Sequence, residues 1–124
     1  MDSKAVVLYI DDEKMNLSAF EILFRKTFNV HTTIDIHKAV EIVREGKIDV
    51  IITDHMMPVM TGVELLKNII EIDSSILRII HSGYIDDPDI QKAAEDGIAH
   101  YVLDKPLDKK LILSAIDEYK QSKK

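Results

Sequence analysis

The chain of 124 residues contains no cysteine, and none of its apolar runs is long. Without cysteine it has neither a disulfide framework nor a thiolate metal site, which fits a reducing compartment. The apolar runs are too short to span a bilayer, and the first residues, MDSK, lack the basic and apolar pattern of a signal peptide. We therefore expect a cytoplasmic protein with no membrane partner.

Basic residues and glycines are also in short supply. The formal net charge is -6, which disfavours nucleic acid as a direct partner because phosphates would be repelled. The four glycines supply neither a GxGxxG fingerprint nor a phosphate-binding loop, so a nucleotide-binding site is disfavoured. The remaining composition, 46% hydrophobic and 31% charged, is that of an ordinary globular domain.

Short apolar segments alternate with longer segments of helical period along the whole chain. We expect strands at 6–10, 29–34, 50–53, 77–81 and 101–103, and helices at 15–28, 36–45, 62–72, 88–94 and around 111–119. This order predicts one domain over 1–124, with a core at about 5–120 and a frayed tail at 121–124. The fold class is α/β, a doubly wound (βα)5 sandwich in which helices cover both faces of a parallel sheet.

Polar side chains follow four of the five predicted strands. Asp11 and Asp12 follow the first, Asp54 the third, Ser82 the fourth and Lys105 the fifth. Because the carboxyl ends of parallel strands share one edge, we expect all five residues to converge there. Three carboxylates without a cation would repel one another, whereas a divalent cation with oxygen ligands, Mg²⁺ or Mn²⁺, would remove the repulsion. The alternative is that one aspartate of the first pair caps the following helix.

The same residues suggest phosphoryl chemistry. Asp54 can act as a nucleophile toward phosphorus and form an aspartyl phosphate. The metal would neutralise the phosphoryl oxygens, Lys105 would pair with one of them, and the Ser82 hydroxyl would donate to another. Taken singly, Ser82 before Gly83 could be a turn residue and Lys105 a solvated lysine.

Four segments, LYIDDEK, IITDHMMPVMTG, IIHSGY and DKPLD, resemble the receiver domain of two-component response regulators, in particular single receivers of the chemotaxis type. The resemblance covers nearly the whole chain. It implies a flavodoxin-like sheet of order 2-1-3-4-5 and a phosphorylation-dependent signalling switch rather than an enzyme. The phosphodonor would be a sensor histidine kinase or a phosphotransfer protein, and the downstream protein target is unknown. Since the last predicted helix ends near residue 119, we expect a stand-alone receiver.

The resemblance also implies a role for each residue of the metal site. Asp54 is the phosphoacceptor and ligates Mg²⁺ together with Asp12 and the backbone carbonyl of Met56. Asp11 contributes mostly through water. The domain would assist its own phosphorylation and dephosphorylation.

The family resemblance further implies how the signal leaves the site. Ser82 is the switch hydroxyl, Lys105 contacts the phosphoryl group, and the bond from Lys105 to Pro106 is expected to be cis. The output surface comprises the fourth helix, fifth strand and fifth helix, around Ile90, Ala93, Tyr101, Ile112 and Tyr119.

One feature departs from the family pattern. The switch aromatic of the family lies three residues before the lysine, where this chain has Val102. Counted from Gly97, however, Tyr101 is in the expected place, so one extra residue lies between Tyr101 and Lys105. We expect a β-bulge to absorb it. Tyr101 is then either the switch aromatic or a half-buried strand residue, and both readings stay open.

Met56 and Tyr84 are interpreted as residues that tune the lifetime of the phosphorylated state. Each lies two residues after a site residue, Asp54 and Ser82 respectively, and would flank the path of a hydrolytic water. Both are bulky, and neither is a ready general base. We therefore expect slow intrinsic dephosphorylation, with loss of phosphate timed mainly by a partner.

Two further functions compete with the switch. A phosphohydrolase with an aspartyl nucleophile commonly has a second aspartate two positions later, where this chain has Met56, and a domain of this size lacks a cap over the substrate. A degenerate receiver would bind partners without phosphate, but the complete set of five residues argues against it. Of the five histidines, only His55 and His81 are placed near the rim of the site.

Overall fold

The computed structural model describes residues 4–122, and in this range five strands alternate with five helices. The strands are β1 (Val6–Ile10), β2 (Asn29–Thr33), β3 (Val50–Thr53), β4 (Leu77–Ser82) and β5 (Tyr101–Asp104). The helices are α1 (Lys14–Phe24), α2 (Ile36–Arg44), α3 (Gly62–Ile72), α4 (Pro88–Glu95) and α5 (Lys109–Ser122). The strands form one parallel sheet of order β2-β1-β3-β4-β5, which confirms the predicted doubly wound architecture.

Most element bounds agree with the predicted ones, and the exceptions have local causes. Helix α1 ends at Phe24, four residues earlier than expected, and a turn follows in which the amides of Thr27 and Phe28 both donate to the Phe24 carbonyl. Phe28 is nevertheless buried and its ring lies 5.6 Å from that of Phe24, so the apolar period continues past the helix. Helix α5 extends through Ser122, so half of the predicted tail is helical, and residues 123–124 lie outside the described range.

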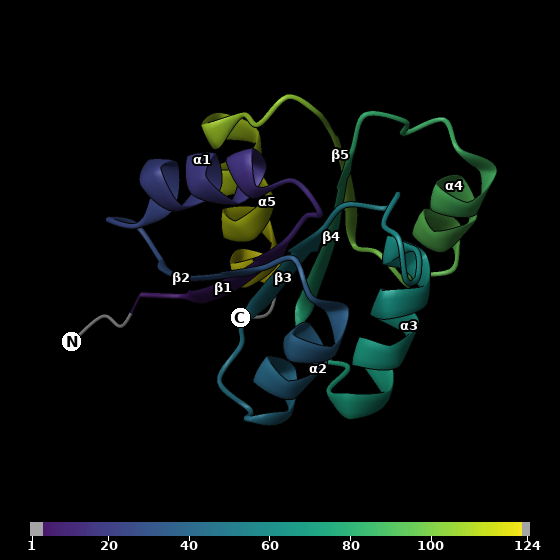
Figure 1. The fold of residues 1–124 in the computed structure, drawn as a ribbon, viewed down its shortest axis with the longest axis horizontal. Coiled ribbons are helices and arrows are strands. Elements are labelled where there is room, and N and C mark those ends of the chain that lie inside the picture. The colour runs from purple at the N-terminus through teal and green to yellow at the C-terminus, as the bar shows by residue number, and fades with distance from the viewer. Residues whose placement is uncertain (1–3, 123–124) are drawn as a thin grey trace.

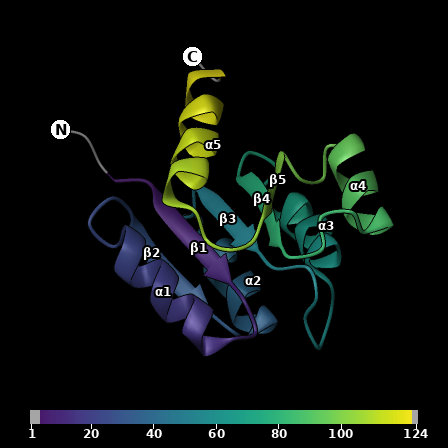
Figure 2. The ribbon, with the colours of Figure 1, turned by 90° about the horizontal axis from the view of Figure 1, so that it is seen from above.

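Helices α1 and α5 cover one face of the sheet, and α2, α3 and α4 cover the other (Figures 1 and 2). Successive residues of a strand point to opposite faces. Val7 and Tyr9 of β1 accordingly pack toward α1 and α5, whereas Leu8 and Ile10 pack toward α2 and α3. A strand buried on both faces needs apolar residues at every position, which explains the uninterrupted run of β1.

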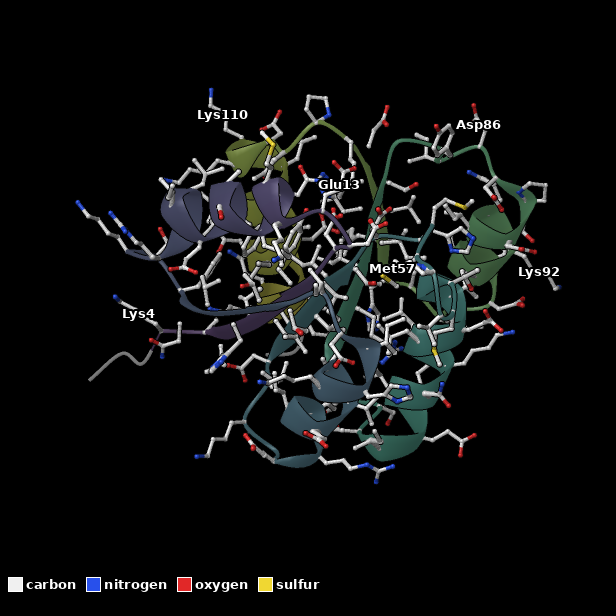
Figure 3. The ribbon with its side chains drawn as sticks, in the orientation of Figure 1. Lys4, Glu13, Met57, Asp86, Lys92 and Lys110 are labelled. Atoms are coloured by element: carbon white, nitrogen blue, oxygen red, sulfur yellow. The ribbon has the colours of Figure 1, made fainter. Side chains whose placement is uncertain are left out.

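Strand register brings the predicted site residues to one edge of the sheet. Ile10 pairs with Thr53, and Thr53 with Ile80, so the residues after β1 and β3 leave the sheet side by side. In Figure 3, Glu13 and Asp86, from the loops after β1 and β4, lie in the upper half of the view, whereas Lys4, which precedes β1, lies on the left at about mid-height. The loops at the carboxyl ends of the strands therefore form the functional edge.

Gly62 fixes the distance between α3 and the loop that follows β3. Its amide donates to the His55 carbonyl at 2.9 Å. A Cβ at this position would overlap the Asp54 carbonyl oxygen, which belongs to the backbone and cannot move aside. Helix α3 can therefore begin directly against the Asp54 backbone only because residue 62 has no side chain.

We expect Gly62→Ala to destabilise the fold by about 1–3 kcal/mol, the usual cost of overpacking a tight contact. Gly83→Ala is the matched control, since a Cβ there meets no atom within 4 Å. Urea unfolding followed by circular dichroism measures both free energies of unfolding. Equal effects of the two substitutions would show that the contact at Gly62 is readily relieved.

Candidate functional site

Asp11 is a fully buried carboxylate that is surrounded by donors. Its Oδ1 accepts from the Glu13 amide at 3.0 Å, and its Oδ2 accepts from Asn16 Nδ2 at 3.0 Å and Lys105 Nζ at 3.0 Å. Burial alone would raise the pKa of Asp11, but the Glu13 amide, the Lys105 ammonium and Asn16 outweigh it and hold that pKa below its usual value. Asp11 is therefore ionised in the folded protein at neutral pH.

The Lys105 ammonium forms ion pairs with the aspartates that follow the first and third strands. Its Nζ lies 3.0 Å from Asp11 Oδ2 and 3.1 Å from Asp54 Oδ2. Burial opposes the charge of Lys105, but its hydrogen bond with Asp11 and the attraction of both carboxylates raise its pKa. Asp54 is buried as well, and its Oδ1 accepts from the His55 amide at 2.7 Å. The structure thus brings Asp11, Asp54 and Lys105 together as the sequence predicted.

Asp12 completes a triad of carboxylates. One oxygen from each of Asp11, Asp12 and Asp54 lies within 4.8 Å of the other two. Partial desolvation raises the pKa of Asp12, and the neighbouring charges of Asp11 and Asp54 raise it further. Lys105 offsets one of the three negative charges, so an acidic pocket of oxygen donors remains. Such a donor set fits a hard divalent cation.

The capping alternative for the aspartate pair is wrong. The N-cap of α1 is Glu13, and its side chain makes no capping hydrogen bond. Asp11 accepts from the backbone N–H of Glu13 itself, and its only bond to the first helical turn is with the side chain of Asn16 rather than with a backbone N–H. The two aspartates therefore line the acidic pocket and do not cap α1.

Ser82, at the end of β4, is fully buried. Its Oγ accepts from the Tyr84 amide at 3.0 Å, so the serine does support the local turn. A hydroxyl that accepts one hydrogen bond retains its own hydrogen for donation. The turn and a donor role are therefore compatible.

Met56 and Tyr84 are both strongly exposed, at 56% and 71%. They line a groove of about 770 Å³ together with Gly83, the residue after Ser82. The groove also includes Asp86, Asp87 and Asp104, and the residues that line it carry no basic group. The two residues predicted to tune phosphate lifetime therefore line one groove, and their effect on that lifetime stays a prediction.

The β-bulge expected between Tyr101 and Lys105 is absent from the described ladder. Four consecutive pairs join β4 and β5, ending with Ser82 opposite Asp104, and the Lys105 amide then donates to the Ser82 carbonyl at 3.0 Å. The extra residue instead lengthens β5. Tyr101 packs on the α5 face, where its hydroxyl donates to Glu118 Oε1 at 2.8 Å, and Val102 packs on the opposite face. The role of Tyr101 as a switch stays a prediction.

The predicted output surface is wrong for three of its five residues. Ile90, Ala93 and Ile112 are each at most 1% exposed, so they belong to the core and cannot contact a partner directly. Their helical spacing reports the buried face of α4 and α5 rather than the outer one. Tyr101 and Tyr119 are half-buried and do reach the surface.

His55, Asp87 and Asp89 form a second group with metal-ligand atoms within 4.8 Å of one another. His55 Nδ1 accepts from the Val63 amide at 3.4 Å, so the neutral imidazole carries its proton on Nε2. That nitrogen faces Asp87 Oδ2 at 4.0 Å and has no lone pair for a metal. We interpret the group as a link from the loop after β3 to the N-terminus of α4.

Sequence reasoning missed two contacts of Asp11. Asn16 lies five residues later, on the first turn of α1, and the helix geometry could have placed it near the pocket. Tyr9 reads as one more apolar strand residue, yet its hydroxyl lies 3.5 Å from Asp11 Oδ2. Because side chains alternate along β1, the sequence places Tyr9 on the correct face of the sheet, but it does not predict the contact of the hydroxyl with Asp11.

The Response regulator receiver domain family matches residues 7–117, and the chain belongs to that family. Receiver domains are the phosphoacceptor domains of two-component signalling, so this chain is a signalling domain with a flavodoxin-like fold. No helix within residues 4–122 has the length and apolar character needed to cross a membrane.

Individual relatives agree with this assignment. The hydrogenase transcriptional regulatory protein HoxA of Cupriavidus necator is 37% identical over 82% of this chain, which spans 21% of HoxA. Sporulation initiation phosphotransferase F of Bacillus subtilis is 28% identical over 91% of both chains. A response regulator receiver domain protein from Clostridium thermocellum superposes with a TM-score of 0.84 at 30% identity, over 96% of each chain. Because HoxA is much longer, the stand-alone organisation over 1–124 stays a prediction.

We expect Asp12→Asn to stabilise the metal-free protein at neutral pH and to remove its response to Mg²⁺. A carboxyl whose pKa is raised on folding destabilises the folded state once ionised, so the gain is full above the raised pKa of Asp12 and fades as the pH falls through it. Mg²⁺ at ten times its dissociation constant should stabilise the wild type by about 1.4 kcal/mol. Urea unfolding in EDTA and in Mg²⁺ measures both effects.

Asp117→Asn, an exposed change on α5, is the control and should alter neither quantity. If Asp12→Asn kept the full response to Mg²⁺, the cation would not be held through Asp12.

Proposed function

We propose that this chain is a phosphorylation switch in which Asp54 accepts a phosphoryl group from a sensor histidine kinase or a phosphotransfer protein in the cytoplasm. The observation that carries the proposal is the position of Lys105 Nζ, 3.0 Å from Asp11 and 3.1 Å from Asp54, beside Asp12. A cation fixed next to the acceptor carboxylate is what a transferring phosphoryl group requires.

The chemistry follows from these contacts. A carboxylate oxygen of Asp54 forms a bond to phosphorus while the bond from phosphorus to the donor histidine nitrogen breaks, and the electron pair stays on that nitrogen. Lys105 pairs with one phosphoryl oxygen, and the Ser82 hydroxyl donates to another. Mg²⁺, held through Asp12, Asp54 and the Met56 carbonyl, would neutralise charge on the phosphoryl oxygens, and Asp11 would act on the cation through water. The domain thereby assists its own phosphorylation and dephosphorylation.

The output of the switch is assigned to the surface of α4, β5 and α5. Ser82 lies at the end of β4 and pairs with Asp104 of β5. Movement of its hydroxyl toward a phosphoryl group would therefore be transmitted to β5, where Tyr101 bonds to Glu118 of α5. A protein target would bind the exposed side of this surface. The domain would make no direct contact with nucleic acid or membrane.

Incubation with acetyl phosphate and Mg²⁺ should give a single phosphate adduct by intact mass. Asp54→Ala should give none, because the nucleophile is gone, and EDTA should suppress the adduct on the wild type. Asp117→Ala, which removes an exposed carboxylate far along α5, should leave the adduct unchanged. Lack of an adduct on the wild type would favour a degenerate receiver, and an adduct on Asp54→Ala would place the acceptor elsewhere.

We expect Met56→Asn to accelerate the loss of phosphate from the phosphorylated protein. An amide at the entrance can orient a hydrolytic water, whereas the exposed thioether of Met56 cannot. Inorganic phosphate release after removal of the phosphodonor measures the rate. Val59→Asn changes another exposed apolar residue of the same loop and is the control. Rapid release from the wild type that Met56→Asn leaves unchanged would refute the tuning role.

A further inference from the structure

The groove lined by Met56 and Tyr84 differs in charge from other hollows of the surface. Asp86, Asp87 and Asp104 line this acidic groove, and no lysine, arginine or histidine does. Four other hollows in the described part of the chain each include a basic side chain in their lining: Lys4 and Lys120, Lys67 and Lys92, Lys105, and Arg44. The acidic groove therefore stands out by a charge of one sign.

Two of its three carboxylates are available to a ligand. The Asp86 and Asp104 side chains are exposed, and among the described residues neither makes a hydrogen bond or an ion pair. Asp87 differs, because it accepts from the Asp89 amide at 2.8 Å and lies 4.0 Å from His55 Nε2. Asp104 ends β5, and Figure 3 shows Asp86 on the loop that joins β4 to α4, so two segments supply the available charge.

Exposed apolar side chains share the acidic groove with these carboxylates. Met56 and Tyr84 are both more than half exposed. An aromatic face attracts a cation, and the aliphatic stem of an arginine or a lysine packs on apolar surface while its charge reaches a carboxylate. A planar guanidinium stacks on an aromatic ring, whereas an ammonium does not. The combination of Tyr84 with free carboxylates therefore favours arginine.

The loop on one side of the acidic groove is held by hydrogen bonds of its own. The Asp87 amide donates to the Tyr84 carbonyl at 3.0 Å, and the Gln91 side chain donates to the Ile85 carbonyl at 2.7 Å. The Tyr84 amide donates to Ser82 Oγ at 3.0 Å. A surface with a fixed wall loses little conformational entropy when a ligand binds. The acidic groove is therefore formed before any partner arrives.

A single metal ion is a poor match for these carboxylates. Among the described residues, neither Asp86 nor Asp104 belongs to a group of three ligand residues whose atoms could meet at one ion. The volume of about 770 Å³ is in the range of pockets that hold a sizeable organic ligand. Carboxylates spread over a groove of this size match a ligand that carries several separate cations.

We propose that the acidic groove is a docking site for an arginine-bearing segment of a partner protein. Asp86 and Asp104 pair with its guanidinium groups, and the Tyr84 ring stacks on one of them. Asp104 is paired with Ser82 in the sheet, so a docked segment lies beside backbone that adjoins the phosphoacceptor site. Docking requires no phosphoryl transfer, so it goes beyond the proposed function of Asp54 and does not depend on it.

Fluorescence anisotropy of fluorescein-labelled hexa-arginine, titrated with the unphosphorylated protein, tests the proposal. The double variant Asp86→Asn, Asp104→Asn should weaken binding roughly fivefold, since two exposed ion pairs are lost. Asp87 is left intact because it caps α4. The control Glu41→Gln, Asp117→Asn removes the same charge from exposed positions outside the acidic groove and should leave the affinity nearly unchanged.

The choice of cation tests the aromatic contact. Hexa-arginine should bind the wild type more tightly than hexa-lysine, and Tyr84→Ser should abolish that preference. Tyr84→Phe keeps the ring and should retain it. Backbone amide chemical shifts of the isotope-labelled protein should change at residues 83–87 and at Asp104 when hexa-arginine is added, which locates the binding.

Equal weakening by the two double variants would overturn the proposal, because it would show attraction to the net charge of the chain rather than to the acidic groove. So would chemical-shift changes confined to other surfaces, or equal affinity for hexa-arginine and hexa-lysine. Spermine that bound as tightly as hexa-arginine and displaced it would assign the groove to a free polyamine instead. A dimer in sedimentation equilibrium, lost only in the groove variant, would assign it to a second copy of this chain.

The test is separate from that of the proposed function. Absence of a phosphate adduct on the wild-type protein would overturn the role of Asp54 as phosphoacceptor, while hexa-arginine binding at Asp86 and Asp104 would still support the docking site.

Discussion

The ammonium of Lys105, shared by Asp11 and Asp54, is the interaction on which the site depends. A carboxylate as fully buried as Asp11 is tolerable only when donors surround it. One of those donors, Lys105, comes from the residue that follows β5, the outermost strand on that side of the sheet. Parallel strands in the order β2-β1-β3-β4-β5 make this possible, because they bring the ends of β1, β3 and β5 to one edge. With three carboxylates and one ammonium, the pocket has two negative charges left over, which is the charge that a dication offsets.

Strand periodicity explains why the extra residue before Lys105 matters. Pairing of β4 with β5 continues one-to-one through Asp104, so the insertion is absorbed by length rather than by a bulge. Since side chains alternate between faces, lengthening a strand by one residue reverses the face on which a given residue lies relative to the strand end. Tyr101 consequently packs with α5 and Val102 with the helices of the other face. The site keeps its lysine, while the aromatic residue and the aliphatic residue next to it occupy opposite sides of the sheet.

Patterns of period two and period 3.6 were enough to predict the fold, and polar residues at strand ends were enough to predict Asp11, Asp54 and Lys105 as neighbours. Two kinds of information lay beyond such patterns. Ile90, Ala93 and Ile112 carry a helical stripe, but a stripe marks only the apolar face, and that face proved to be buried. Tyr9 and His81, whose hydroxyl oxygen and Nδ1 lie 3.3 Å apart, are separated by 72 positions; Tyr9 lies between two apolar residues of β1, and His81 follows two isoleucines of β4. Their contact depends on strand register and on side-chain rotamers, neither of which a single sequence specifies.

The donor count of Lys105 gives the pocket a way to change state without leaving a buried charge unpaired. An ammonium has three donors, and two of them are directed to Asp11 and Asp54. Under the proposed function, a phosphoryl oxygen on Asp54 would engage the third donor or replace the bond to Asp54, while the bond to Asp11 persists. Asp11 would in either case keep the Glu13 amide and Asn16. Because no step requires an isolated carboxylate in the interior, the reorganisation can stay confined to Lys105, and the cost of exchange stays small compared with that of breaking a buried ion pair.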